Sequence, residues 1–258
     1  MARCPFARWM PLPWSAGQYT ARPFRIIHHT TEGSTAAGAF ATYQQGHDIP
    51  HFTIDDQFIY QHLDTDVAAR ALAHPSGTVQ TNKYSAIQFE LVGFAGRPKS
   101  HASLTNVGRL CRWIESTHNV PAIWPNGLPN PPDRGRDPGH HNRNEPNWRT
   151  LGGHYGHCHV PENSHWDPAY TAEEVQTVMA VPGADAEHQI VAETAALTDM
   201  AVRASRQARP ERIGREKKAR AAKKANGVKK AAKKATKKAV KKRKAPAKRG
   251  RKGGPKAR

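Results

Sequence analysis

The sequence predicts an α/β fold in which helices cover a β-sheet. Residues 24–29 and 86–92 are short apolar runs of the kind that forms buried strands, and in the second run apolar residues alternate with Gln88 and Glu90. Residues 103–118 carry apolar side chains at helical spacing, which predicts an amphipathic helix lying on that sheet. The strand pattern places Glu90 on the sheet face opposite the apolar residues of its own strand.

The remaining elements follow in chain order. Residues 34–46 begin with a capping serine and end at a glycine, which predicts a helix. Residues 51–63 (HFTIDDQFIYQHL) are two apolar runs separated by Asp-Asp-Gln, a pattern typical of a β-hairpin. A capping box formed by Thr171 and Glu174 predicts the start of another helix, and residues 184–202 predict a last one.

A long segment between residues 121 and 148 is rich in proline, glycine and asparagine. Loops of this length inside a compact domain are either functional or disordered. We interpret it as a solvated surface loop, although its aromatic residues and arginines are also suited to line a groove. The same loop holds His140 and His141, a competing source of metal-ligating imidazoles.

Charge divides the chain into two parts. From Arg203 onward lie 26 of the 40 lysines and arginines but only two of the 21 acidic residues. The first part is therefore mildly acidic and the second strongly basic. We predict an N-terminal extension over residues 1–21, a folded domain over 22–182, a helical linker over 183–202 and a disordered tail over 203–258, because the tail has too few apolar residues to build a core.

Two further features bear on the cellular compartment. The first 14 residues contain two arginines and three prolines and lack the uninterrupted apolar run of a secretory signal. We therefore expect the protein to be made in the cytoplasm without a signal peptide. The chain has three cysteines at irregular spacing, and this odd count argues against a disulfide framework.

The chemically densest stretch runs from His154 to Pro168 (HYGHCHVPENSHWDP), with four histidines and one aspartate. Imidazole and carboxylate suit a catalytic zinc ion, which takes three protein ligands and leaves one position for water. One short loop rarely surrounds an ion alone, so we expect a further ligand from the pair His28 and His29. Alternation along the strand sends these two side chains to opposite faces, so only one of them faces the site. Cys158 is a less favoured ligand.

Four motifs, in this order, resemble the zinc-dependent N-acetylmuramoyl-L-alanine amidases of type 2: IIHHTTEG, HFTIDDQFIYQHLDTD, NKYSAIQFELVG and GHCHVPENSHWDP. That family shares its fold with peptidoglycan recognition proteins and with many phage lysins. The resemblance covers residues 22–180 and marks residues 22–182 as an amidase domain. It implies a mixed central β-sheet flanked by helices, with Zn²⁺ in a groove at one face of the sheet.

The resemblance also implies the metal ligands. The first histidine of the family's paired-histidine motif falls on His28. A later ligand in the family follows a glycine and precedes an Asp-Pro by ten residues, which matches His157 and Asp167. His159 is the alternative to His157.

The catalytic residues are implied in the same way. Glu90 matches the acidic residue that some members use as catalytic base. The lysine that often stands two residues before the last ligand is replaced by His165, whose imidazole can also stabilise an oxyanion. The tyrosine that some relatives place before the hairpin is replaced by Pro50, so its role is absent or taken by another residue.

The implied activity is zinc-dependent hydrolysis of the amide between N-acetylmuramic acid and L-alanine in peptidoglycan. Cell-wall lysis by an endolysin, released to the wall through a separate membrane-piercing protein, fits this reading. The alternatives are a non-catalytic peptidoglycan-binding module and a nucleic-acid-binding protein with a degenerate amidase domain. No obligate protein partner is evident.

The basic tail requires a partner of its own. Lys-Lys pairs recur every four residues in KKAAKKATKKAVKKRK, and the tail resembles the lysine-rich tails of linker histones. Such segments bind polyanions by releasing counterions. We expect anionic cell-wall polymers or a membrane surface as the target, with nucleic acid as the alternative.

Overall fold

The computed structural model describes residues 2–46, 48–183 and 200, and in the basic tail Lys223, Lys224, Asn226, Gly227, Lys229, Lys230, Lys233 and Lys234. Residues 1–189 and 190–258 form two separate units. The predicted helix over residues 184–202 lies outside the described residues except for Met200. Most of the predicted disordered tail lies outside them as well. The eight described tail residues have helical backbone, and the predicted disorder of the tail stays a prediction.

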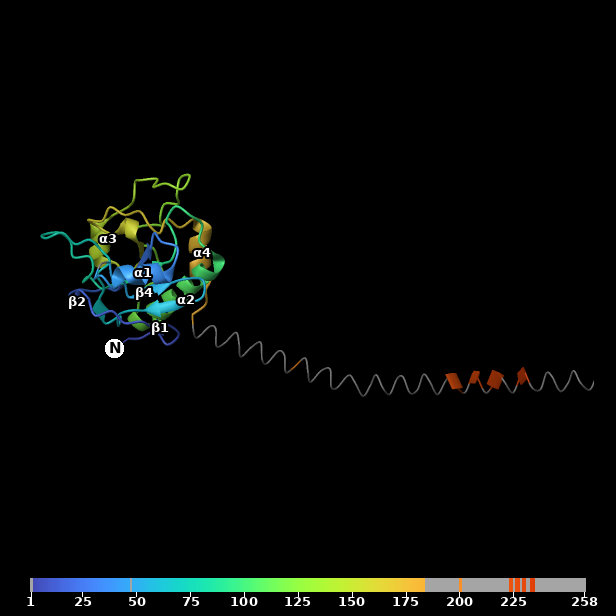
Figure 1. Ribbon diagram of the computed structural model, residues 1–258. Helices are drawn as coiled ribbons and strands as arrows, with labels where there is room; N and C mark the ends of the chain where they lie inside the picture. Colours follow the sequence, from blue (N-terminus) through green and yellow to red (C-terminus); the bar gives the residue numbers. More distant parts are fainter. Residues whose placement is uncertain are drawn as a thin grey trace, which may run out of the picture. The chain divides into compact units, whose positions relative to one another are not determined.

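A six-stranded mixed sheet with strand order β1-β5-β4-β7-β3-β8 forms the centre of the first unit (Figure 1). Its strands are β1 (Arg8–Trp9), β3 (Arg25–Thr30), β4 (Phe52–Ile54), β5 (Ile59–Gln61), β7 (Ala86–Leu91) and β8 (Gly153–Gly156). Strand β3 is parallel to both of its neighbours, β7 and β8, whereas β4 and β5 form the predicted antiparallel hairpin. Strands β2 (Gly17–Gln18) and β6 (Val67–Ala68) pair separately. The predicted α/β class with a mixed sheet is confirmed.

Four α-helices accompany the sheet in the described part of the chain: α1 (Ala36–Tyr43), α2 (His101–His118), α3 (Glu145–Thr150) and α4 (Ala172–Ala180). Side chains of Thr35, Ser100 and Thr171 accept hydrogen bonds from the first turns of α1, α2 and α4, so local sequence sets where these helices start. A single 3₁₀ turn, η1 (His157–His159), follows β8. Within the described residues, every helix is too short or too polar to cross a bilayer.

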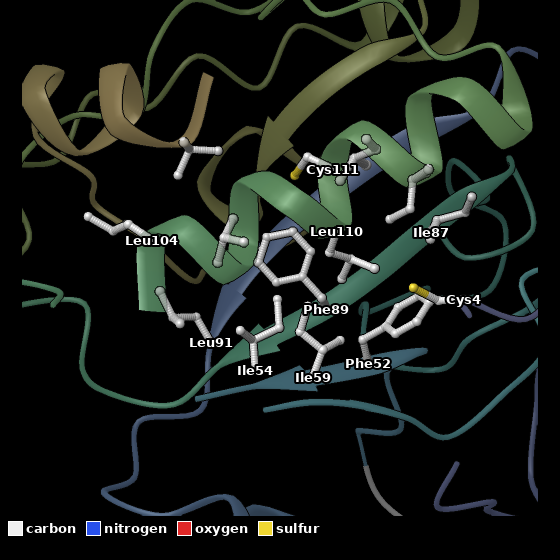
Figure 2. Close-up of a cluster of buried hydrophobic side chains, with 14 of the residues drawn as sticks. Cys4, Phe52, Ile54, Ile59, Ile87, Phe89, Leu91, Leu104, Leu110 and Cys111 are labelled. Atoms are coloured by element: carbon white, nitrogen blue, oxygen red, sulfur yellow. The ribbon is translucent and has the colours of Figure 1, made fainter. Parts of the chain in front are cut away.

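The main core lies between α2 and one face of the sheet (Figure 2). Ile87, Phe89 and Leu91 of β7 face α2, as their alternation predicted, and all three are fully buried. Residues 1–21, predicted as an extension, contribute to this domain. Strand β1 extends the edge of the sheet beside β5, and Cys4 is part of the core.

Strand β8 was not predicted, because its sequence GHYG has no apolar alternation. Glycine is what allows the chain to fit there. A Cβ atom at Gly152 would lie 2.8 Å from the Phe24 carbonyl oxygen, and one at Gly153 would lie 2.6 Å from the Ile123 carbonyl oxygen. Gly153 also has a φ of +140°, which residues with side chains rarely adopt. The strand therefore lies in backbone contact with its surroundings.

Two histidines at the β4–β5 hairpin, His51 and His62, are buried and neutral. Burial lowers the pKa of each to about 4. His51 accepts a hydrogen bond at Nδ1 from the Gln88 backbone N–H over 3.0 Å, and its Nε2 donates to the Val67 carbonyl oxygen over 2.8 Å. A protonated His51 would lose the bond from Gln88, because Nδ1 would then carry a hydrogen.

Because of these two histidines, we expect the stability of the metal-free protein to fall in acid. The unfolded chain takes up their protons near pH 6.5, whereas the folded chain resists until the pH reaches about 4. Their contribution to stability is complete above about pH 6.5 and is lost as the pH falls from there to about 4, at a cost of about 3 kcal/mol for each histidine. Urea unfolding across this range measures the loss. In the variant His62→Gln, the free energy of unfolding lost between about pH 6.5 and about pH 4 should be smaller by about 3 kcal/mol. An unchanged pH dependence would contradict the explanation.

Candidate metal centre and active site

The candidate site begins with His29, near the carboxyl end of strand β3, which lies between β7 and β8. Register places His29 opposite Glu90 of β7, so both side chains project from the same face of the sheet, away from α2. His29 is 1% exposed. Its Nδ1 lies 3.0 Å from the His157 Nδ1, 3.8 Å from the Asp167 Oδ2 and 3.9 Å from the Glu90 Oε1.

The loop after β8 brings His157 and Asp167 to the same point. The two residues are ten positions apart, yet the His157 Nδ1 lies 3.2 Å from the Asp167 Oδ1. The other His157 nitrogen, Nε2, donates to the Asn163 Oδ1 over 2.9 Å. The amide of Asn163 is itself oriented, because its nitrogen donates to the carbonyl oxygens of Ala73 and Pro161. Asn163 thereby fixes the tautomer of His157 and directs the Nδ1 lone pair toward His29 and Asp167.

Asp167 is held as a carboxylate. Burial alone would raise its pKa, but interactions with His157, His29 and the Thr30 backbone N–H outweigh burial and lower the pKa to about 2. The Thr30 N–H donates to the Asp167 Oδ2 over 3.0 Å. For His157 the effects have the opposite sign. Burial alone would lower its pKa, but interactions with Asp167 and Asn163 outweigh burial and raise it.

The donor atoms of His29, His157 and Asp167 lie within 4.8 Å of one another and all three residues are buried. Two imidazole nitrogens and one carboxylate oxygen are the donor set of catalytic zinc sites that keep one position open. The three residues border a cavity of about 350 Å³, so a ligand position facing this cavity stays accessible. These residues therefore fit a zinc ion.

Glu90 lies in the same cavity and is 8% exposed. Its Oε2 has no hydrogen-bond partner among the described residues. Burial, and after it the charges of Asp167, Asp48 and Glu32, raise the pKa of Glu90 well above its usual value. A carboxyl group with a raised pKa beside a metal site is suited to take up and release a proton.

His165 stands at the mouth of the cavity. Its ring stacks on that of His157 with centroids 4.6 Å apart and planes 5° from parallel. Its side chain is 65% exposed, and its Nδ1 lies 3.9 Å from the Asp167 Oδ1. The structure thus brings His165 to the exposed edge of the site.

The structure corrects the prediction of His28 as a ligand beside His157 and Asp167. His28 points to the opposite face of β3, where its ring contacts Phe89 and Trp124 at centroid distances of 4.6 and 4.9 Å. The reason is the pleat of the strand, which turns successive side chains to opposite faces. His29, the other member of the pair, takes the place that His28 was predicted to occupy.

The other candidate ligands lie elsewhere. The His159 Nδ1 accepts a hydrogen bond from the Gly156 N–H over 3.1 Å, and His141 contacts Asp137 at 2.7 Å. Cys158 is buried, which raises the pKa of its thiol to about 12, and its sulfur is not one of the clustered donors. The structure therefore places His157, and not His159 or Cys158, beside Asp167.

Tyr43, at the end of α1, was not predicted as a site residue. It lines the same cavity as Glu90, and its hydroxyl is buried without a hydrogen-bond partner among the described residues. Burial, and after it the charge of Glu90, raise the pKa of Tyr43, so the hydroxyl keeps its proton as a hydrogen-bond donor. A tyrosine hydroxyl is thus present at the site although Pro50 occupies the position expected from the resemblance.

A second cavity of about 380 Å³ adjoins the first and shares Glu32 with it. Its walls carry Arg97 and Arg136, and beside them Arg134, together with Phe94 and Trp166. Arg134 pairs with Asp133 at 3.4 Å. Two of the three arginines come from the long loop over residues 121–148, which therefore contributes to a cavity wall.

Comparison with known proteins gives one family and several similar structures. Residues 19–170 match the N-acetylmuramoyl-L-alanine amidase family. No curated protein matches significantly. The hydrolase AmiA of Staphylococcus aureus, solved with its ligand, is 14% identical, with a TM-score of 0.46, and the match covers 69% of this chain and 82% of that one.

Two other solved structures are similar. The N-acetylmuramoyl-L-alanine amidase LysC of Clostridium intestinale is 14% identical, with a TM-score of 0.44 and coverage of 69% and 100%. A mutant endolysin from Bacillus subtilis is 24% identical, with a TM-score of 0.35 and coverage of 47% and 80%. TM-scores this low carry no argument about function, so the assignment depends on the family match. Since that match spans more than half of the sequence, the chain belongs to the N-acetylmuramoyl-L-alanine amidase family, whose members hydrolyse the amide between N-acetylmuramic acid and L-alanine in peptidoglycan.

Proposed function

We propose that this amidase depends on a zinc ion held by His29, His157 and Asp167, and that it acts as an endolysin. The observation that carries the zinc proposal is the convergence of these three buried donors at a cavity that also contains Glu90. A zinc ion bound there would polarise the scissile carbonyl and make water acidic enough to ionise near neutral pH.

Glu90 is the proton carrier in this proposal. It stands beside His29 at 3.9 Å and has a free carboxylate oxygen, so it can accept a proton from the attacking water. The same carboxyl group then donates that proton to the leaving amine of L-alanine. General acid and base catalysis of this kind contributes roughly 100- to 10,000-fold to a rate.

Two further groups stabilise the charge that develops on the carbonyl oxygen. His165 reaches the site from the exposed edge, stacked on His157. The Tyr43 hydroxyl is a buried donor on the α1 side of the same cavity. Donors fixed in place before the reaction stabilise an oxyanion without reorganising during it. Tyr43 thereby supplies the tyrosine that Pro50 cannot.

Digestion of purified peptidoglycan by the full chain tests the zinc proposal. Protein stripped with a chelator should release no stem peptides, and added Zn²⁺ should restore the release of peptides that begin with L-alanine, as read by mass spectrometry. The variant His157→Ala should stay inactive with zinc. Full activity of the chelator-treated protein would exclude a metal requirement, and binding to walls without cleavage would favour the recognition-module alternative.

The endolysin role predicts activity that is confined until the membrane opens. Bacteria that express the chain in the cytoplasm should keep a constant turbidity and then lyse when chloroform permeabilises the membrane. Spontaneous lysis without chloroform would contradict the need for a separate membrane-piercing partner.

A chain that lacks residues 203–258 tests whether the basic tail holds the enzyme on anionic wall polymers. At low salt, this shortened chain should bind purified walls more weakly than the full chain.

The arginine-lined cavity predicts where the charged part of the substrate binds. Stem peptides carry carboxylates, and guanidinium groups bind carboxylates through paired hydrogen bonds. We expect the double variant Arg97→Gln and Arg136→Gln to raise KM for a muropeptide about tenfold with little change in kcat, because the contacts are made equally in ground and transition states. Arg134→Gln, which removes an arginine already paired with Asp133, is the matched control and should have a smaller effect. An unchanged KM in the double variant would show that the substrate does not use this cavity.

A further inference from the structure

We infer that the chain has a second metal site, on the opposite face of β3, in which His28, His154 and Cys111 hold a zinc ion through two imidazoles and one thiolate. The site is separate from the catalytic centre. It does not depend on the function proposed above.

The three side chains come from three elements that meet in the core. His28 belongs to β3, His154 to its neighbour β8, and Cys111 to α2, which lies over this face of the sheet (Figure 2 shows Cys111 on α2). All three have no exposed surface. Their donor atoms lie within 4.8 Å of one another, and the His28 Nε2 stands 3.0 Å from the His154 Nδ1.

The same arrangement occurs at the catalytic centre. There the His29 and His157 nitrogens also face each other at 3.0 Å, beside a third donor. The two clusters therefore differ mainly in their third member, which is a carboxylate on one face of β3 and a sulfur on the other. Structural zinc sites take four nitrogen and sulfur donors, and this cluster supplies three of them.

A carboxylate orients His154 for this role. Its Nε2 lies 2.8 Å from the Glu115 Oε1, and Glu115 also pairs with Arg112. With Nε2 carrying the hydrogen, the Nδ1 lone pair points toward His28 and Cys111. Histidines that bind metals generally donate their second ring nitrogen to a carboxylate or carbonyl in this way. His154 with Glu115 thus matches His157 with Asn163.

Cys111 would join the site as a thiolate. Burial raises the pKa of the Cys111 thiol, so the sulfur keeps its proton until zinc binds. Binding then breaks the S–H bond, forms the sulfur–zinc bond and releases one proton to solvent.

Such a site would fasten α2 to strands β3 and β8. One ion would join β3, β8 and α2 through a single centre, and its binding free energy would add to the stability of the fold. The paired histidines of β3 would then each hold a metal, one on each face of the strand.

Cobalt(II) tests the inference, because thiolate ligation to Co²⁺ gives an intense near-ultraviolet charge-transfer band that imidazole and carboxylate ligands do not give. Metal-free full-length protein is titrated with CoCl₂. We expect two equivalents to bind and the thiolate band to develop. Asp167→Asn should lose one equivalent and keep the band, whereas Cys111→Ser should lose the band and keep one equivalent and the cleavage of peptidoglycan. Cys4→Ser and Cys158→Ser are matched controls. Each should keep both equivalents of bound metal and the thiolate band.

His154→Gln serves as a second variant in case Cys111→Ser fails to fold, and circular dichroism checks the fold of each. His154→Gln should also lose the thiolate band. A single bound equivalent without a thiolate band in the wild-type protein would overturn the inference and leave His28 and His154 as a hydrogen-bonded pair. Retention of the band in Asp167→Asn would support the second site even if cleavage proved independent of zinc.

Discussion

Replacing His29 with alanine is expected to abolish peptidoglycan cleavage, with a fall in rate of about a thousandfold or more. The substitution removes one of three donors at the catalytic centre, and metal ions of this type supply several kcal/mol of transition-state stabilisation, at about 1.4 kcal/mol for each factor of ten. Release of L-alanine-terminated stem peptides measures activity, and metal analysis should show one equivalent fewer per chain.

The matched control is His28→Gln. His28 is the immediate neighbour of His29 but faces α2, so its replacement should leave cleavage within about threefold of the wild type, a change of less than 1 kcal/mol in transition-state energy. The thermal midpoint of each variant separates lost chemistry from lost folding. If His28→Gln were inactive while a folded His29→Ala retained activity, the catalytic metal would be the one on the α2 side of the strand.

Glu90→Gln should reduce kcat by roughly 100- to 10,000-fold without removing the metal. Glutamine has nearly the shape of glutamate but cannot accept the proton of the attacking water. Metal content should stay at the wild-type value, and KM should change little. Glu32→Gln is the matched control. Glu32 borders the same cavity and accepts a hydrogen bond from the Ala95 N–H over 2.7 Å, which an amide oxygen can equally accept.

The same Glu90 substitution should stabilise the metal-free protein. Burial and three neighbouring carboxylates raise the pKa of Glu90, so its charged form is unfavourable in the fold. This cost grows as the pH rises from the ordinary glutamate value through the raised one, and Glu90→Gln removes it. The variant should therefore melt at a higher temperature than the wild type at neutral pH. A lower melting temperature would indicate that Glu90 stabilises the fold. A loss of activity in Glu90→Gln could then not be separated from a loss of packing.

Much of the site could be predicted from sequence, because its residues lie in local motifs. The spacing from His157 to Asp167 lies within one loop, and alternation in β7 placed Glu90 away from the core. The choice between His28 and His29 could not be made in this way. Both belong to one strand, and which of them faces Glu90 depends on the register between β3 and β7, where His29 pairs with Glu90.

Other features depended on contacts between distant segments. Tyr43 reaches the cavity because α1 lies over that face of the sheet, and nothing in its own neighbourhood marks it. Asn163 gave a weak signal, since it stands between two histidines of the metal-binding loop. Strand β8 gave none, because a glycine-rich strand lacks the apolar alternation from which strands are predicted. These are the residues whose roles required the assembled fold.

The close approach of β8 to the rest of the chain also has a consequence for protein engineering. At Gly152 and Gly153 any side chain would meet backbone oxygens, which cannot rotate out of the way as a neighbouring side chain can. Sequence libraries that seek a changed wall specificity should therefore leave this strand unaltered. The loop over residues 121–148 offers the better place for diversity, because it borders the arginine-lined cavity and lies outside the sheet.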